Sequence, residues 1–151
     1  MPLRNFIGEC LIYRTSITTE TIDSYLAADY IVNAVESFVL KIGKPSVEID
    51  RWFKAKNYDR AAYVTAWNPL GEKIPDYKNY AAEKKLILEI ESCNLFYLKG
   101  KSIDPSGVWV DEPSVLIFGI LLKSAKELAK RYRQNGFVYV DSDTKPQLIL
   151  L

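Results

Sequence analysis

Histidine is absent from this chain of 151 residues. Without an imidazole, a single chain cannot build a Ser-His-Asp or Cys-His nucleophile system, a histidine acid–base pair or a histidine-ligated metal site. Any catalysis must therefore use carboxylates, lysine, tyrosine or a hard cation.

Cysteine is also scarce, with Cys10 and Cys93 as the two examples. They lie far apart and form no Cys-x-x-Cys pair, which argues against a zinc site and against a thioredoxin-like redox pair. We expect two plain buried thiols, and neither a metal nor a cofactor.

The chain has no excess of either charge and no long hydrophobic run. Twenty basic and nineteen acidic residues give a net charge of +1, so no global field attracts nucleic acid or an anionic membrane. No apolar run approaches the roughly 20 residues that span a bilayer, and no cleavage-site pattern follows the first residues. We expect a soluble cytoplasmic protein without a membrane partner.

A local basic run leaves nucleic-acid binding open as a hypothesis. Basic residues between Lys41 and Arg60 alternate with Trp52, Phe53 and Tyr58. Trp52 and Phe53 already serve the apolar face of an expected helix, so the pattern favours lysines on its solvated side. Nucleic acid is therefore a disfavoured partner, and the pattern gives no oligomeric state.

The residues present, 48% of them hydrophobic, suffice for one core. Apolar periodicity predicts four helices: one capped by Thr18 or Thr19 with Ile22, Tyr25 and Leu26 on its buried face, one from Ser46 to near Asn57, one over 77–92, and one capped by Ser124 and stopped by Asn135-Gly136. Strands are predicted over 30–33, 37–42, 61–67, 94–99, 114–121, 137–140 and 147–151. This pattern indicates one layered α+β domain with a mixed, largely antiparallel sheet of about seven strands and about four helices.

The apolar strand over 61–67 runs directly into Trp67, Asn68 and Pro69. Strand ends of this kind commonly carry ligand contacts, and an indole with an amide can stack on a ligand and hydrogen-bond to it. Asn79 heads the otherwise apolar stripe of the next helix, either as a clamp for this corner or as a pocket residue. The alternative is structural: Trp67 is core and Asn68 fixes the turn.

A second group of candidates surrounds a turn-rich loop. Glu112 follows Trp109 and precedes an apolar strand, where burial could raise its pKa and make it a proton carrier. Asp104 and Asp111 could join it in a magnesium-binding cluster, although acidic loop residues are usually solvated. Further along, Gln134 and Asn135 stand at a predicted helix end, where capping competes with a role in a pocket.

The order of these motifs resembles the DUF3293 family of bacterial proteins of unknown function. The resemblance runs from about residue 18 to residue 151, leaves 1–17 as an N-terminal extension, and implies no activity. It rests on Thr65-Ala-Trp-Asn-Pro69, Asn79, Gly100, Asp104-Pro105, Gly107-x-Trp109, Glu112-Pro-Ser114 and Gln134-Asn135.

Three hypotheses on function follow. The leading one is a binding module for a polar ligand or a protein partner, through strand-end loops that carry Trp67, Asn68, Asn79, Trp109, Glu112, Gln134 and Asn135. A convergence of these groups would suit a neutral ligand such as a nucleobase or a sugar. The alternatives are an enzyme that uses Glu112 as its acid–base group, and an interaction module that uses a sheet edge or residues 1–17.

Overall fold

The computed structural model describes residues 4–7, 10–13 and 17–151. The first two segments are strands β1 (Arg4–Ile7) and β2 (Cys10–Tyr13), which pair antiparallel in a small sheet of their own. The predicted extension over 1–17 thus contains a hairpin, while 1–3, 8–9 and 14–16 lie outside the described residues. The domain boundary near residue 18 stays a prediction.

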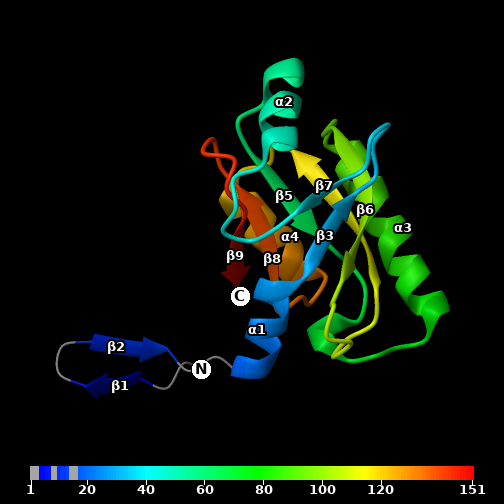
Figure 1. Cartoon of the computed structure of the whole chain (residues 1–151). Helices are drawn as coiled ribbons and strands as arrows, with labels where there is room; N and C mark the ends of the chain where they lie inside the picture. Colours follow the sequence, from blue (N-terminus) through cyan, green and yellow to red (C-terminus); the bar gives the residue numbers. More distant parts are fainter. Residues whose placement is uncertain (1–3, 8–9, 14–16) are drawn as a thin grey trace.

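The main body consists of one sheet and its helices (Figure 1). Its elements in chain order are α1 (Thr19–Ala27), β3 (Asp29–Val32), β4 (Phe38–Leu40), α2 (Val47–Lys56), β5 (Ala61–Val64), the 3₁₀ turn η1 (Pro69–Gly71), α3 (Asp76–Ser92), β6 (Tyr97–Ile103), β7 (Glu112–Phe118), α4 (Leu122–Arg131), β8 (Gly136–Val140) and β9 (Gln147–Leu150). The sheet order is β4-β3-β6-β7-β5-β8-β9. All six pairings of this sheet are antiparallel. The predicted α+β fold with four helices and seven strands is confirmed, although the described sheet contains none of the parallel pairs that a mixed sheet would have.

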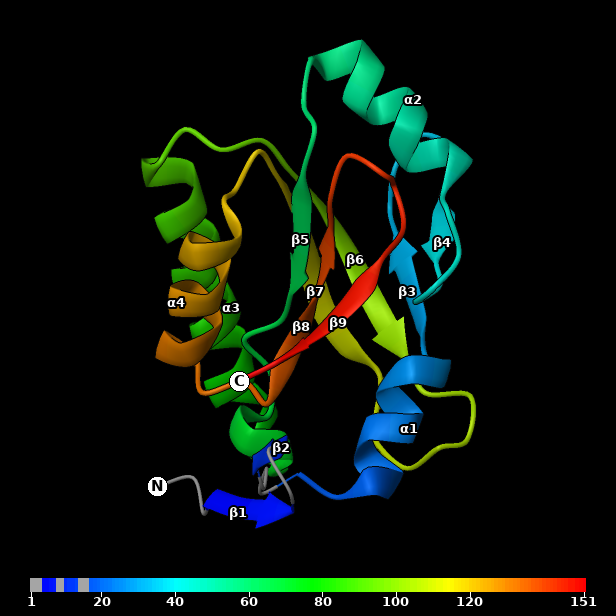
Figure 2. The ribbon, with the colours of Figure 1, turned by 90° about the vertical axis from the view of Figure 1, so that its left-hand side faces the viewer.

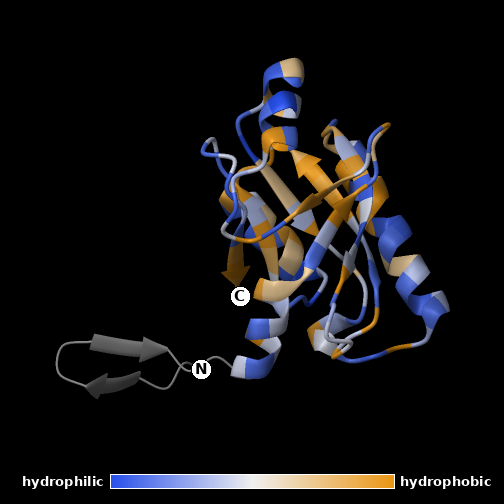
Figure 3. Ribbon diagram, viewed as in Figure 1, coloured by the Kyte–Doolittle hydropathy of each residue, from blue (hydrophilic) through white to orange (hydrophobic). Residues whose placement is uncertain are grey.

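The helices cover the two faces of the sheet differently. Figure 2 shows α3 and α4 together on one face, whereas α2 and α1 lie at opposite ends of the other. Strand alternation supplies both cores: Ala62, Val64, Val115 and Ile117 pack toward α3 and α4, and their neighbours Ala61, Tyr63, Leu116 and Phe118 face the other way with Ile49 and Phe53 of α2. The apolar strands between more polar helices are visible in Figure 3.

Helix starts were predicted with mixed success. The side chains of Thr18 and Ser46 cap α1 and α2 as expected, and Asn57 ends α2 in the left-handed region. Ser124 does not cap α4, because the helix begins earlier, after an extended Leu121 whose carbonyl accepts from the amide of Ala125.

The predicted stop at Asn135-Gly136 is also wrong. The left-handed residue is Arg133, with φ of 54°, because Gly136 already pairs with Leu150 in β8 and β9. The turn out of α4 must therefore be completed before Asn135.

Two predicted buried side chains prove to be exposed. Leu26 lies in a short helix that covers the end of the sheet rather than its face, and its side chain reaches solvent while Ser24 is buried. Cys93 is the C-cap of α3, where the helix leaves the core, and its thiol is exposed. The side chain of Cys10 is outside the described part. Within the described residues, no helix combines the length and the apolar character required to cross a membrane.

Candidate functional site

A cavity of about 60 Å³ lies beside α1, on the sheet face that carries Tyr63 and Glu112. Its walls come from α1, from every strand of the main sheet except β4, from the loop before β7 and from the segment after α4. The lining residues are Tyr25, Tyr30, Tyr63, Thr65, Ser102, Trp109, Glu112, Ser114, Gln134, Asn135, Gly136, Phe137, Val138 and Leu148. We call this space the Glu112 cavity.

Strand alternation explains why polar side chains gather there. Glu112 and Ser114 share a face of β7 with Leu116 and Phe118, so the strand that is apolar under α2 becomes polar toward α1. Across the sheet, Glu112 pairs with Ser102, which in turn pairs with Tyr30. One row of cross-strand neighbours therefore crosses the cavity wall.

Gly100 allows the tyrosines to approach this wall. A Cβ atom at this position would lie 2.1 Å from the carbonyl oxygen of Ile31 and 2.9 Å from the hydroxyl of Tyr63. That hydroxyl donates to the same carbonyl at 2.8 Å. The ring of Tyr63 also packs edge-on against Tyr30, with centroids 5.4 Å apart.

Asn68 connects the corner after β5 to Glu112. It adopts a left-handed conformation, with φ of 45°, which an asparagine tolerates better than most residues. Its backbone amide donates to Asn79 Oδ1 at 2.8 Å, and its Oδ1 accepts from Asn79 Nδ2 at 2.9 Å and from the amide of Ile74 at 3.2 Å. Its Nδ2 then donates to Glu112 Oε1 at 3.3 Å. The backbone amide and Oδ1 of Asn68 are thus used within the corner, and its Nδ2 makes the contact with the cavity carboxylate.

The amides after α4 bind other parts of the wall. Gln134 Nε2 donates to the carbonyls of Trp67 at 3.1 Å and Tyr132 at 3.2 Å, so it caps the helix end and ties it to the corner after β5. Asn135 Nδ2 donates to the hydroxyl of Tyr25 at 3.2 Å. Both side chains therefore serve structure and line the cavity.

The loop before β7 is organised by Asp104. Its carboxylate accepts from the hydroxyl and amide of Ser106 and from the amides of Val108 and Trp109, and these bonds hold the pKa of Asp104 below its usual value despite an opposing effect of burial. The loop carries Trp109, whose indole donates to Ser24 Oγ at 3.1 Å.

The predicted acidic cluster around Glu112 does not form in the described residues. The carboxylate oxygens of Asp104 accept hydrogen bonds from its own loop, and the carboxylate of Asp111 forms an ion pair with Lys101 at 3.5 Å. Nor does the described part of the chain hold any group of three or more histidine, cysteine or acidic residues placed to bind a metal.

Burial makes Glu112 the most strongly perturbed acid of the site. Loss of solvent raises its pKa from 4.5 to about 7, and the hydrogen bond from Asn68 opposes part of this rise. Burial likewise raises the pKa of Tyr25 and of Tyr30, and the charge of Glu112 adds to both effects. Near neutral pH, Glu112 can therefore either accept or donate a proton while the tyrosines remain neutral.

Four of the seven site residues predicted from sequence line the cavity: Trp109, Glu112, Gln134 and Asn135. Asn68 contacts Glu112 from behind the wall, and Asn79 supports Asn68. Trp67 is buried elsewhere, with its indole donating to Glu83 at 3.2 Å and its ring packed edge-on against Tyr80.

Sequence reasoning missed all six hydroxyl groups of the wall as site groups. They belong to Tyr25, Tyr30, Tyr63, Thr65, Ser102 and Ser114. Polar residues at alternate positions of apolar strands are the signal that could have found those on the strands. That signal becomes specific only when the pairing of distant strands is known.

A comparison with protein-family models finds a similarity over the segment that carries part of this site. The model of DUF3293, a protein of unknown function, matches residues 64–136. The predicted resemblance to DUF3293 is thus confirmed. The matched segment is shorter than predicted; it contains Trp109, Glu112 and Gln134, whereas Tyr25 and Tyr30 lie before it. Searches of curated proteins and of solved structures gave no match.

Proposed function

We propose that this DUF3293-like domain binds a small polar ligand in the Glu112 cavity. The observation that supports the proposal is the convergence of a partly buried carboxylate, two amides, six hydroxyl groups and Trp109 on one open space. Among the described residues, the Glu112 carboxylate accepts a single hydrogen bond, from Asn68. A carboxylate can accept about four, so most of its capacity is available to a ligand.

The size and charge of the cavity limit the classes of ligand that can bind. A volume of about 60 Å³ holds several water-sized groups, since one water needs roughly 10–15 Å³, and this fits a small molecule or one end of a larger one. Among the described residues, no lysine or arginine lines the wall. Phosphorylated and carboxylated ligands are therefore disfavoured, because they would meet Glu112 without a compensating cation.

A ligand screen by thermal unfolding tests the proposal. A ligand at one hundred times its Kd adds about 2.7 kcal/mol to the free energy of unfolding, and each kcal/mol raises Tm by about 2–4 °C in a protein of this size. The panel should contain sugars, nucleosides, small amides and amines, with calorimetry on each hit.

Two matched variants place a hit in the cavity. Leu148→Phe enlarges a cavity-lining side chain on β9 and should abolish binding, whereas Leu88→Phe makes the same change on the exposed surface of α3 and should leave it intact. A hit that survives Leu148→Phe binds elsewhere. The absence of any hit across the panel would count against a ligand site.

A second candidate function is acid–base catalysis by Glu112. The raised pKa of about 7 favours it, because a general acid or base works best when its pKa is near the operating pH. In this case Glu112→Gln would abolish turnover of a bound substrate and leave its Kd nearly unchanged. The pH profile of kcat in the unmodified protein would show an inflection near that pKa. If no bound ligand is chemically altered, catalysis is excluded and the binding function remains.

A further inference from the structure

Five of the six hydroxyl groups that line the Glu112 cavity donate their protons to backbone carbonyls. Tyr30 donates to the carbonyl of Tyr25 at 2.6 Å, and Tyr63 to that of Ile31 at 2.8 Å. Thr65 donates to Pro113 at 2.7 Å. A hydroxyl that has given its proton to a carbonyl can only accept from a ligand.

The two serines of the wall behave in the same way. Ser102 and Ser114 both donate to the backbone carbonyl of Glu112, at 3.4 and 3.0 Å. The amide nitrogens of Gln134 and Asn135 are also engaged within the protein. Of the six hydroxyls that line the cavity, only that of Tyr25 has no assigned donation among the described residues. The cavity is therefore rich in acceptors and poor in donors.

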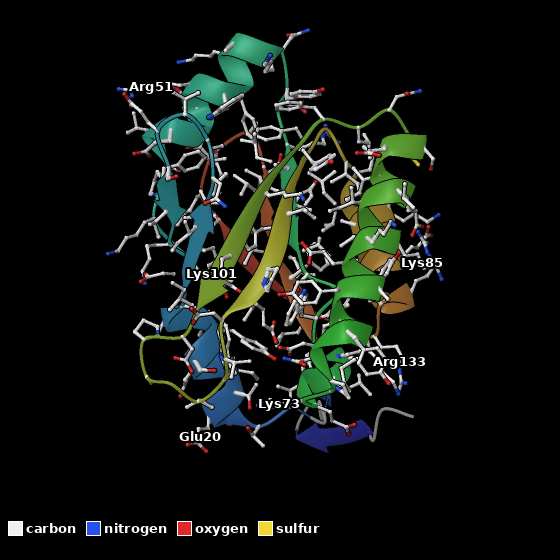
Figure 4. All side chains as sticks on the ribbon, turned by 90° about the vertical axis from the view of Figure 1, so that its right-hand side faces the viewer. Glu20, Arg51, Lys73, Lys85, Lys101 and Arg133 are labelled. Carbon is white, nitrogen blue, oxygen red and sulfur yellow. The ribbon has the colours of Figure 1, made fainter. Side chains whose placement is uncertain are left out.

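The carboxylate of Glu112 has no cationic partner among the described residues. Lys101, on the neighbouring strand β6, precedes the cavity residue Ser102 and so projects from the opposite face, where it pairs with Asp111. The basic side chains labelled in Figure 4 belong to separate elements, with Arg51 on α2 and Lys85 on α3, and none of them lines the cavity.

Aromatic rings complete this environment. Tyr25 and Trp109 pack edge-on with centroids 6.1 Å apart, and Tyr30 and Tyr63 form a similar pair. All four line the same space as Glu112. Aromatic rings attract cations through their electron-rich faces, and this attraction grows when water is excluded.

From these contacts, and resting on the proposed function, we infer that the ligand presents an ammonium group with N–H donors to Glu112. Such a group supplies the charge that the carboxylate lacks and the donors that the surrounding hydroxyls require. A neutral sugar would bring its own acceptors to a wall with few free donors, so it satisfies the cavity less well.

Calorimetry with small probes tests the inference. At a pH of about 8, Glu112 is mostly ionised. Ethanolamine carries an ammonium group, ethylene glycol is its neutral counterpart of similar size, and tetramethylammonium has the charge without N–H donors. We expect ethanolamine to bind at least about tenfold more tightly than ethylene glycol, because a charge-assisted hydrogen bond contributes that much or more.

Each alternative result has a defined meaning. Equal binding of ethylene glycol would overturn the ammonium inference and leave the proposed polar-ligand site standing. Tetramethylammonium binding as tight as that of ethanolamine would overturn the requirement for N–H donors. If none of these probes binds but a sugar or a nucleoside does, the ammonium inference fails and the proposed function stands; if no member of the thermal-unfolding panel binds either, the proposed function itself fails. Including the amide of Nα-acetyl-lysine separates two sources of the ammonium group: tighter binding than ethanolamine supports a lysine side chain, and weaker binding supports a free amine.

Substitution and proton linkage provide independent readouts. Glu112→Gln should weaken ethanolamine binding about tenfold or more, whereas Glu127→Gln, on the exposed surface of α4, removes the same charge without effect. Near pH 7, bound ammonium should favour ionised Glu112 and release a proton, which calorimetry in two buffers of different ionisation enthalpy detects. Binding without proton release, or unaffected by Glu112→Gln, would show that the ammonium group lies away from this carboxylate.

Discussion

Replacing Glu112 with glutamine should stabilise the unliganded protein, and only above acidic pH. Glutamine is neutral, like the protonated acid, and keeps an oxygen that can accept the hydrogen bond from Asn68. Because burial raises the pKa of Glu112 in the folded protein, folding favours its protonated form. The ionised form is therefore the one that costs stability.

The magnitude follows from the two pKa values. The rise from 4.5 to about 7 corresponds to about 3 kcal/mol, at about 1.36 kcal/mol for each pKa unit. Below pH 4.5 the side chain is protonated in both folded and unfolded chains, and the two proteins should be equally stable. The advantage of Glu112→Gln should grow as pH rises between these values and stay constant above about 7.

Urea unfolding of both proteins across this pH range measures the effect. Tyr25 on α1 and Tyr30 on β3 stay neutral across this range because burial raises their pKa above 10, and taking the difference cancels the titration of Asp104 in the loop. A parallel series with Glu127→Gln should stay within about 0.5 kcal/mol of the unmodified protein at every pH, as expected for an exposed site. A flat difference curve, or a less stable Glu112→Gln at high pH, would show that Glu112 is not a desolvated acid.

Two other substitutions probe the supports of the cavity. Asn79→Ala removes both partners of the Asn68 clamp and should cost about 2–4 kcal/mol by urea unfolding; a loss under about 0.5 kcal/mol would mean that water replaces the clamp. Gly100→Ala places a methyl group against the carbonyl of Ile31 and should cost about 3 kcal/mol or more in a thermal or urea melt. Gly43→Ala, where no atom lies within 4 Å but φ is +83°, should cost only about 1 kcal/mol, and equal losses at both glycines would refute the steric argument.

Sequence patterns identified the elements because burial imposes a strong period on them. The uninterrupted apolar run of β5 is buried throughout, and Asn79, Leu86 and Ile90 are buried on α3 as their spacing predicts. The errors arose where tertiary context decides a boundary. The end of α4 is set by the pairing of Gly136 in β8, and this pairing cannot be read from the helix itself.

The difference between local pattern and tertiary context also decides which residues of the site could be predicted. Glu112 could be selected from sequence because an acid beside an apolar strand is locally unusual. Tyr30 and Ser102 could not be joined to it, because their row depends on the register between β3 and β6, which lie far apart in the chain. Trp67 was assigned to the ligand site on its position after β5, yet the local pattern does not specify to which side an indole turns.

The strand order also affects how the protein folds during its synthesis on the ribosome. Strand β3 can pair at once with β4 but must wait for β6 on its other side, and β5 leaves the exit tunnel before either of its partners, β7 and β8, exists. Such non-local pairing slows folding and leaves nascent strands open to aggregation, which makes protection by chaperones valuable during translation. The cavity has walls from both early and late strands, because Tyr30 lies on β3 while Val138 and Leu148 lie on β8 and β9. A nascent chain halted before Gly136 should therefore lack the wall that Gly136, Val138 and Leu148 supply.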